Sequence, residues 1–505
     1  MRSTFNFTVM GNLAGLIFAL ASLAVSSTLA TSSRPHVILI LADDYGFHDI
    51  GYHGSKIKTP VLDKLAGEGV KLEKYYVQPI CTPTRSQLMT GRYQIHTGLQ
   101  HSVIHPWVPN SLPLDETTLP QKLKEYGYAT HMVGKWHLGF YKEECVPHKR
   151  GFDSFFGYYN GQEDYLTHIR AGGFDFRDND NLATNYNNTY SSFVFAEHAK
   201  KVILGHNKSQ PLFLYIPFQA VHAPLEAPAS YIEPYKTIFP ANKSRQIYAG
   251  MAACMDEAIG NITATLKSTG LYDNSVIIFS TDNGGIIQQG GNNWPLRGWK
   301  NTLWEGGVRA VGFVHSPLLP KQVLGTVNHQ LIHVSDWFPT IVEGLAKGDT
   351  KGTKPLDGYN VWPCISENKA SPRNEILHNI DPLTVIHQGK RWKNSTFDVR
   401  VRAALRSGDW KILTGVYGSV NWIAPPSSGI VPFYPNVVKD QVVFLFNITA
   451  DPNEYNDLSG KYPEVVDSML EKLANYNKTA VPCVYPLPDP KSDPRFHGGV
   501  WGPWR

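Results

Sequence analysis

Short apolar runs alternate with helical patterns over most of the chain. Three runs are rich in branched residues and almost unbroken by polar ones, as in strands buried on both faces of a sheet: residues 36–41, 211–217 and 275–280. Between them, apolar residues recur at helical spacing: residues 60–69, 119–127 and 247–269. Strands alternating with helices predict an α/β fold with a mainly parallel central sheet flanked by helices.

The pattern changes towards the C-terminus. Two short strands flank the turn Ser407-Gly408-Asp409, a third strand is predicted at residues 442–448, and a helix at residues 463–476. A Pro/Ser/Gly-rich loop is predicted at residues 423–432. We therefore predict two domains, a large one at residues 34–375 and a smaller C-terminal α+β subdomain with an antiparallel sheet at residues 376–505.

The first thirty residues have the layout of a signal peptide. Arg2 is the only early charge, residues 13–25 are apolar, and residues 26–30 are mostly small. The apolar run is short for a transmembrane helix, and an uncleaved signal anchor is the alternative interpretation. We expect a signal peptide over residues 1–30, cleaved after Ala30, and no membrane span in the mature protein.

Composition and charge narrow the class of protein. The 505 residues are 42% hydrophobic and 18% charged, as in a globular protein. The net charge is only +4 and no Lys/Arg run occurs, so no nucleic-acid partner is expected. Seven glycosylation sequons favour an exported glycoprotein of the secretory pathway: Asn187, Asn207, Asn242, Asn261, Asn394, Asn447 and Asn477.

The cysteines carry no zinc-pair spacing: Cys81, Cys145, Cys254, Cys364 and Cys483. Disulfides suit an exported protein, but sequence alone leaves their pairing open, as it leaves open the oligomeric state. Because the number of cysteines is odd, at least one has no partner within the chain. Cys81 is the candidate for that role.

Polar side chains follow each of the three apolar runs. Asp43-Asp44 comes after the first run, His222 after the second, and Asp282-Asn283 after the third. The carboxyl ends of parallel strands gather site residues at one edge of the sheet. Four oxygen-bearing side chains without a thiolate suit calcium or magnesium. Capping of the following helices is the alternative role for each pair.

A cysteine stands before a predicted helix start in Cys81-Thr82-Pro83-Thr84-Arg85. Pro83 favours a helix beginning there, which places Cys81 just before the N-terminus and Arg85 within the first turn. An anion at that point would meet free backbone N–H groups. The alternative is a structural cysteine before an ordinary helix.

Basic residues form a third group. Lys135 and His137 lie two residues apart, so on an extended segment both would face the same side. Lys300 lies in the tryptophan-rich stretch at residues 294–309. Taken singly, each is also compatible with a solvated lysine or a hydrogen-bonded histidine.

Two of these segments resemble the signatures of the sulfatase family. The first signature comprises Cys81, Pro83, Arg85, Leu88, Thr90, Gly91 and Arg92, and the second is Gly134-Lys135-Trp136-His137-Leu138-Gly139. The resemblance implies an alkaline-phosphatase-like large domain and a formylglycine made from Cys81 by the formylglycine-generating enzyme. Thr84 stands where many members have serine, which bears on how completely Cys81 is converted.

The resemblance also implies a ligand set and catalytic roles. One calcium ion, rather than magnesium, would be held by Asp43, Asp44, residue 81, Asp282 and Asn283. Hydrated formylglycine would attack sulfur with help from Asp282, and the alcohol would leave protonated by His222 or Lys300. His137 would take a proton from the second hydroxyl. Lys135 and Arg85 would hold the hydrate in place.

Further segments are similar to arylsulfatase B and to arylsulfatases I and J: residues 90–101, 131–139, 150–157, 292–298, 304–308 and 378–382. This similarity implies a lysosomal or extracellular enzyme acting on N-acetylgalactosamine 4-sulfate units of glycosaminoglycans. A digestive or secreted sulfatase for small sulfates such as glucosinolates is the alternative. Residues 105–114 lack the cysteine pair of that group, and Cys145 lacks the partner expected there.

Two rival functions differ in chemistry. A phosphodiesterase of the same fold would need a serine or threonine nucleophile, and Cys81 in the signature argues against it. A non-catalytic pseudo-enzyme that binds sulfated glycans would be expected to lose site residues, and all ten named here are present.

Overall fold

The computed structural model describes Met1 and residues 34–386, 391–393, 395–419, 421–426, 428–430 and 441–505. The predicted signal peptide and the sequon at Asn394 lie outside these residues, as does part of the predicted loop at residues 423–432. Arg34–Arg505 form one compact unit. Within the described residues, no helix has the length and apolar character needed to cross a membrane.

A ten-stranded sheet forms the centre of this unit, in the order β13-β2-β12-β11-β1-β10-β4-β5-β8-β9. Its strands are β1 (His36–Ala42), β2 (Val70–Leu72), β4 (Ala129–Lys135), β5 (Ser154–Tyr158), β8 (Arg177–Asp178), β9 (Asn181–Leu182), β10 (Leu212–Pro217), β11 (Ser275–Thr281), β12 (Gly312–His315) and β13 (Thr326–Asn328). The five from β11 to β5 run parallel. The predicted α/β fold, with the three apolar runs as neighbouring parallel strands, is therefore confirmed.

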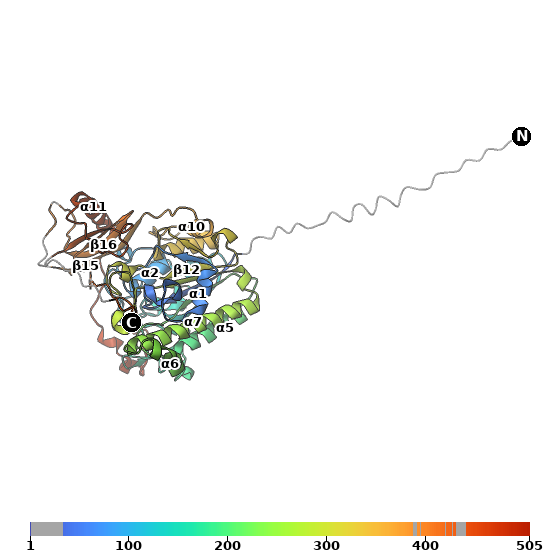
Figure 1. Ribbon diagram of the computed structural model, residues 1–505. Helices are drawn as coiled ribbons and strands as arrows, with labels where there is room; N and C mark the ends of the chain where they lie inside the picture. The colour runs from blue at the N-terminus through green and yellow to red at the C-terminus, as the bar shows by residue number, and fades with distance from the viewer. Residues whose placement is uncertain (2–33, 387–390, 394, 420, 427, 431–440) are drawn as a thin grey trace. The chain divides into compact units, whose positions relative to one another are not determined.

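Helices cover both faces of the sheet because its strands are apolar on both sides. Leu39 of β1 packs into one hydrophobic core, with Leu88 of α2 (Cys81–Thr90). Ile40 faces the other core, with Met255 of α7 (Lys243–Thr269). The first core also takes residues of α4 (Leu119–Lys124) and α10 (Trp362–Glu367), and the second those of α1 (Pro60–Gly67), α5 (Ser191–Gly205) and α6 (Ala229–Ile238). Figure 1 shows α5, α6 and α7 together along one side of the sheet.

A second, antiparallel sheet lies near the C-terminus (Figure 1). It consists of β15 (Glu375–Val385), β16 (Val401–Ser407), β17 (Trp410–Thr414) and β18 (Val443–Asn447), and α11 (Pro463–Thr479) packs on it. The predicted C-terminal strands and helix are confirmed. The boundary predicted between residues 375 and 376 stays a prediction, since no separate unit begins there.

The two faces of this small sheet bury different partners. Leu405 and Ile412 pack against α11, whereas Leu413 and Phe444 pack against Leu303 and Trp304 of the large domain. This follows from the period of two along each strand. The smaller sheet therefore supports a segment that begins only a few residues after Lys300.

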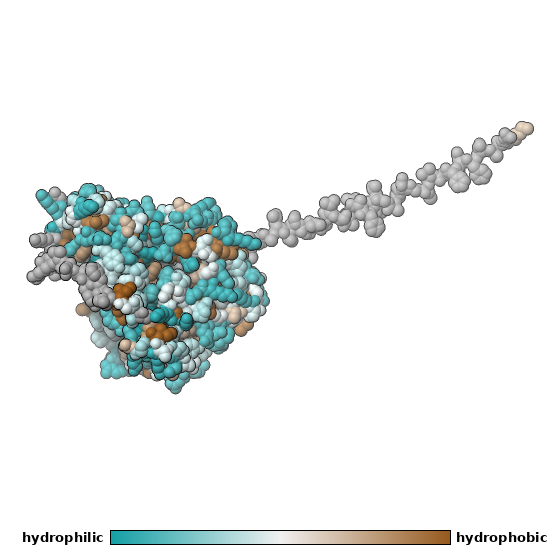
Figure 2. All heavy atoms as spheres, in the orientation of Figure 1, coloured by the Kyte–Doolittle hydropathy of each residue, from teal (hydrophilic) through white to brown (hydrophobic). Residues whose placement is uncertain are grey.

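All five cysteines are free, and four of them are buried. Cys145 donates a weak hydrogen bond to Ser111 (Sγ to Oγ, 3.2 Å), in place of the partner that the arylsulfatase resemblance led us to look for. The face of the molecule in Figure 2 is mostly hydrophilic, with small separate apolar patches, so the compact unit is held together by its cores.

A buried charge cluster ties the second sheet to the first domain. Lys411 Nζ of β17 lies 2.9 Å from Glu305 Oε1 and 2.8 Å from Glu454 Oε1, and none of the three side chains is exposed. Glu454 Oε2 accepts a hydrogen bond from the Glu305 backbone N–H (2.7 Å). Tyr76 donates to Glu305 Oε2 (2.7 Å). The Lys411 ammonium thus lies between two buried carboxyl groups; Arg309 and Arg406 also act on Glu305, and burial raises the pKa of Glu454 to about 7.

Replacing that ammonium leaves two carboxylates buried without their shared counter-charge. We expect Lys411→Met to lower the free energy of unfolding by about 3–5 kcal/mol, as in other broken buried pairs. Lys201→Met, at an exposed position of α5, is the matched control and should change the free energy of unfolding by less than about 0.5 kcal/mol. Chemical denaturation measures both; a Lys411→Met value equal to the control would contradict this interpretation.

Candidate active site

The carboxyl ends of three parallel strands meet at one edge of the central sheet. Asp43 and Asp44 follow β1, Asp282 and Asn283 follow β11, and Lys135 is the last residue of β4. All five are at most 1% exposed. β1 lies between β11 and β10, and β4 comes next, so residues far apart in sequence converge here.

Cys81 enters this edge from α2. The preceding residue, Ile80, is extended, and Cys81 is the first helical residue rather than the one before the helix. Its Sγ lies 3.7 Å from Asp43 Oδ1 and the residue is 2% exposed. Burial, with the nearby Asp43 carboxylate, raises the pKa of the Cys81 thiol to about 12. An unmodified thiol would therefore stay protonated and weakly nucleophilic.

Arg85 joins the helix to both acidic strand ends. It is the fifth residue of α2, one position beyond the predicted first turn. Its guanidinium donates to Asp282 Oδ2 (2.9 Å) and to Asp43 Oδ2 (3.1 Å). Both contacts are fully buried.

Thr84, which stands where many family members have serine, links two backbone segments of the site through its hydroxyl. Its hydroxyl accepts from the Gln78 backbone N–H (2.9 Å) and donates to the Asp282 carbonyl (2.6 Å). A serine hydroxyl makes the same two bonds, so threonine preserves what this position does for the fold of the site.

The acidic residues fit a hard cation. Asp43, Asp44, Cys81 and His222 each offer one ligand atom within 4.8 Å of the others. Asp44 Oδ2 and Asn283 Oδ1 are buried and make no hydrogen bond to any described residue, and a buried oxygen of that kind calls for a partner. The predicted ligand Asp282 is more occupied, because Oδ2 is held by Arg85 and Oδ1 by the Asp44 backbone N–H (3.2 Å).

The carboxyl groups titrate differently although they are neighbours. Burial alone would raise the pKa of Asp43, but Lys135 and the other nearby cations lower it below the ordinary value. Burial raises the pKa of Asp44 despite its contact with Lys300, and burial with the adjacent Asp43 charge raises that of Asp282. The strongest cationic field therefore lies at Asp43, next to Cys81.

Three of the predicted basic residues contact the acidic group directly. Lys135 Nζ pairs with Asp43 Oδ2. Lys300 Nζ lies 2.5 Å from Asp44 Oδ1, and His222 Nε2 lies 3.6 Å from Asp44 Oδ2. His222 Nδ1 lies 2.7 Å from the Ala223 carbonyl, so Nδ1 carries the hydrogen and Nε2 faces the site as an acceptor.

His137 reaches the site by a route that differs from the predicted one. The strand ends at Lys135, and His137 has a left-handed backbone (φ 57°), so the two do not simply alternate along one extended segment. Thr82 Oγ1 fixes the turn by donating to the His137 carbonyl (3.1 Å). Burial lowers the pKa of His137 well below its usual value, and Lys135 adds to this effect. The ring is held neutral, as a base must be.

Two residues that help to position the site were not singled out from the sequence. Thr82 bridges Cys81's helix and the His137 turn, and it also accepts from the Ile104 backbone N–H (3.2 Å). Asn293 Oδ1 accepts from the Gly285 N–H (2.9 Å) and so braces the turn after Asn283. The only signal for either was its place inside a segment of family resemblance.

Access to the cluster is from one side. The side chains of Lys300 and His222 are 11% and 12% exposed, whereas those of Arg85, Lys135 and Asp43 are at most 1% exposed. Among these site residues, Lys300 and His222 are therefore the ones nearest to solvent. The cations around Cys81 are placed to stabilise negative charge that develops on an oxyanion bound there.

Comparisons with known proteins agree with this geometry. The profile of the Sulfatase family matches residues 35–346. Mouse arylsulfatase J is 53% identical over 94% of this chain and 81% of its own length. Human N-acetylgalactosamine-6-sulfatase is 30% identical over 72% of each chain. The crystal structure of Ps i-CgsB with k-i-k-neocarrahexaose superposes with a TM-score of 0.74 at 28% identity, over 90% of this chain and 94% of that one. The chain therefore belongs to the sulfatase family and is a sulfuric ester hydrolase with an alkaline-phosphatase-like fold.

Proposed function

We propose that this enzyme cleaves N-acetylgalactosamine 4-sulfate units of glycosaminoglycans through a formylglycine at position 81. The observation that carries the proposal is the setting of Cys81. It stands at a helix N-terminus, 3.7 Å from Asp43, inside a buried group of three carboxylates and three basic side chains. Members of the family generally use a metal ion and formylglycine.

The metal proposed here is one calcium ion. Asp43, Asp44, Asn283 and residue 81 would hold it, with Asp282 as the remaining ligand of the predicted set. Their hard oxygen atoms, two of them buried without partners among the described residues, support this choice. Bound calcium would supply a positive charge that stabilises the anionic sulfuryl group.

Formylglycine in its hydrated form would supply two hydroxyls, one to attack sulfur and one whose deprotonation releases sulfate. Arg85 and Lys135 would orient residue 81 and the sulfate group from the buried side. Asp282 would assist the first deprotonation. His137, neutral and with Nδ1 unpartnered among the described residues, would accept the proton of the second hydroxyl.

The leaving alcohol needs a proton from the open side of the site, where Lys300 and His222 lie. With hydrogen on Nδ1, neutral His222 presents an acceptor at Nε2. Lys300 carries only donors and lies against Asp44. These hydrogen-bonding roles support Lys300 as the proton donor and His222 as a residue that orients the leaving oxygen.

The proposed substrate rests on the relatives. One relative is named for N-acetylgalactosamine-6-sulfatase activity, and a structural relative was solved with an oligosaccharide. A secreted or digestive sulfatase for small sulfates such as glucosinolates is the second candidate, supported by the missing cysteine pair at residues 105–114. The complete set of gathered site residues argues against a non-catalytic glycan-binding protein.

We also propose passage through the secretory pathway to the lysosome or the extracellular space, with conversion of Cys81 by the formylglycine-generating enzyme on the way. The described sequon asparagines support this proposal because none is buried: Asn187, Asn207, Asn242, Asn261, Asn447 and Asn477. Exposed or half-exposed asparagines are accessible to glycosylation.

The proposed conversion of Cys81 to formylglycine can be tested by peptide mass and by the activity of a variant. We expect mass spectrometry of the tryptic peptide at residues 75–85 to find an aldehyde in place of the thiol. Cys81→Ser lacks the second hydroxyl and should stall as a sulfated enzyme or be inactive, whereas Cys364→Ser, a change at another buried free cysteine, should remain active. Sustained turnover by Cys81→Ser, or an unmodified thiol in active enzyme, would refute the formylglycine mechanism.

Leaving-group dependence identifies the proton donor. We expect Lys300→Met to lower kcat for an alkyl sulfate by about 10²–10⁴-fold, the usual worth of general acid catalysis. The loss of kcat for this variant on nitrophenyl sulfate should be much smaller, because nitrophenolate can leave without being protonated. His222→Gln should lower both rates by similar factors. The reverse pattern would assign the acid to His222.

Substrate preference is tested by steady-state kinetics at acidic and neutral pH. We expect kcat/KM for a 4-sulfated N-acetylgalactosamine oligosaccharide to exceed that for a 6-sulfated one and for a glucosinolate, as the resemblance to arylsulfatase B implies. A higher kcat/KM for the glucosinolate would favour the small-sulfate candidate and would leave the proposed sulfatase mechanism unaffected.

A further inference from the structure

The surroundings of His222 and of Lys300, the two more exposed residues of the site, differ in charge. On the His222 side, Tyr165 donates to the His222 carbonyl (2.8 Å), and its own backbone N–H donates to Glu226 Oε2 (2.9 Å). Asp164 lies beside Glu226, and both are half-buried. Burial and the neighbouring Asp164 raise the pKa of Glu226 to about 7, so Asp164 rather than Glu226 supplies most of the negative charge on this side.

The Lys300 side carries an arginine from the C-terminal sheet. Arg402 of β16 donates to the carbonyl of Asn301 (2.7 Å), the residue after Lys300. Asn301 in turn donates from its backbone N–H to the Pro79 carbonyl (2.6 Å), two residues before Cys81. Arg402 is therefore held beside both segments that carry the proposed catalytic groups.

The guanidinium of Arg402 does not use all of its hydrogen-bond donors within the described residues. Its Nε is buried and makes no hydrogen bond to a described residue. Its nearest acidic neighbour across the sheet is Asp381. That carboxylate is already engaged by His101 Nδ1 (3.0 Å) and by Thr384 Oγ1 (2.7 Å). A half-buried guanidinium with free donors is a receptor for an oxyanion.

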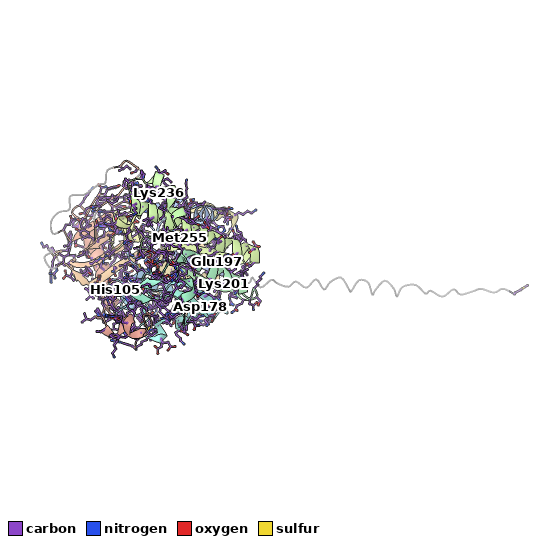
Figure 3. The ribbon with its side chains drawn as sticks, turned by 90° about the horizontal axis from the view of Figure 1, so that it is seen from below. His105, Asp178, Glu197, Lys201, Lys236 and Met255 are labelled. Atoms are coloured by element: carbon purple, nitrogen blue, oxygen red, sulfur yellow. The ribbon has the colours of Figure 1, made fainter. Side chains whose placement is uncertain are left out.

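Aromatic rings gather on the segment that begins at His101, the hydrogen-bond partner of Asp381. The segment that carries His101 continues to Ile104, whose N–H donates to Thr82 next to Cys81. His105 stacks on Trp107 with a centroid distance of 5.2 Å and an interplanar angle of 10°. Tyr485 lies edge-on to His101 (4.6 Å). All four rings are half-exposed. In Figure 3, His105 lies well apart from Glu197 and Lys201 of α5, towards the C-terminal strands.

We propose that Arg402 binds an oxyanion, a carboxylate or a second sulfate, on the sugar unit next to the one that bears the scissile ester. The half-exposed rings of His105, Trp107 and Tyr485 would contact the apolar face of that sugar. The carboxyl groups of Asp164 and Glu226 on the His222 side favour an orientation in which the anionic unit lies towards Arg402. The inference rests on the proposed sulfatase function and adds the substrate class: an oligosaccharide with two anionic groups.

The test compares three sulfate esters. They are a 4-sulfated N-acetylgalactosamine linked to a uronic acid, the same disaccharide with its carboxyl reduced to an alcohol, and the reduced disaccharide with a second sulfate on the neighbouring unit. For wild type, kcat/KM should be higher for at least one dianionic substrate than for the reduced one. Arg402→Gln should lower that ratio at least tenfold, mainly through KM, and Arg402→Lys should restore part of it.

The two dianionic substrates separate a carboxylate receptor from a sulfate receptor. Arg495→Gln, at an arginine whose side chain is 86% exposed, is the matched control and should leave the ratio unchanged. Equal losses on all three substrates would mean that Arg402 only holds Asn301 and Lys300, and would overturn the proposal, as would an unchanged ratio. If wild type hydrolyses none of the three nor nitrophenyl sulfate, the proposed function itself fails.

Discussion

The bridge from Arg85 to Asp43 and Asp282 is the interaction on which the site depends. It joins the helix that presents Cys81 to the ends of two central strands, entirely out of contact with water. Removing charges from water is costly, and such a bridge persists only where geometry and further hydrogen bonds compensate. Here Arg85 also donates to the Lys135 carbonyl (3.2 Å), and Lys135 pairs with Asp43. The same contacts that satisfy the buried charges therefore hold Cys81, Asp43, Asp282 and Lys135 in fixed positions relative to one another.

The C-terminal sheet belongs to this arrangement although it supplies none of the predicted catalytic residues. Its inner face packs on Leu303 and Trp304, and Arg297 lies over the Trp304 ring at 3.6 Å. The loop that carries Lys300 is thus enclosed between this sheet and the turn after Asn283. Gly284 is needed there, because a Cβ atom would lie 1.8 Å from the Gly306 carbonyl oxygen. Lys300 is positioned by packing from both sides rather than by its own flexible stem.

Much of this could be predicted from the sequence because the buried strands are short, apolar and followed at once by acids. Asp43, Asp44, Asp282 and Asn283 meet as expected, since parallel strands end at one edge. What depends on tertiary contacts could not be predicted. The left-handed turn at His137 needs the Thr82 bond, and the partner of Asp282 is a residue 197 positions away. Arg402 carried no local signal at all, since its neighbourhood comes from β15 and the Asn301 carbonyl.

The residues around Cys81 and those around Arg402 differ in burial, and this difference bears on specificity. The residues around Cys81 are buried, mutually paired and close-packed, so a change in any of them disturbs several charges at once. The residues proposed to contact the neighbouring sugar are half-exposed and come from the segment around His105, the start of β16 and the C-terminal segment at Tyr485. A substitution there would alter the proposed contacts with the sugar and would disturb fewer buried charges. If the proposed roles hold, the sulfate-cleaving chemistry is set by the central sheet, while the choice of ester is set beside the smaller sheet at Arg402.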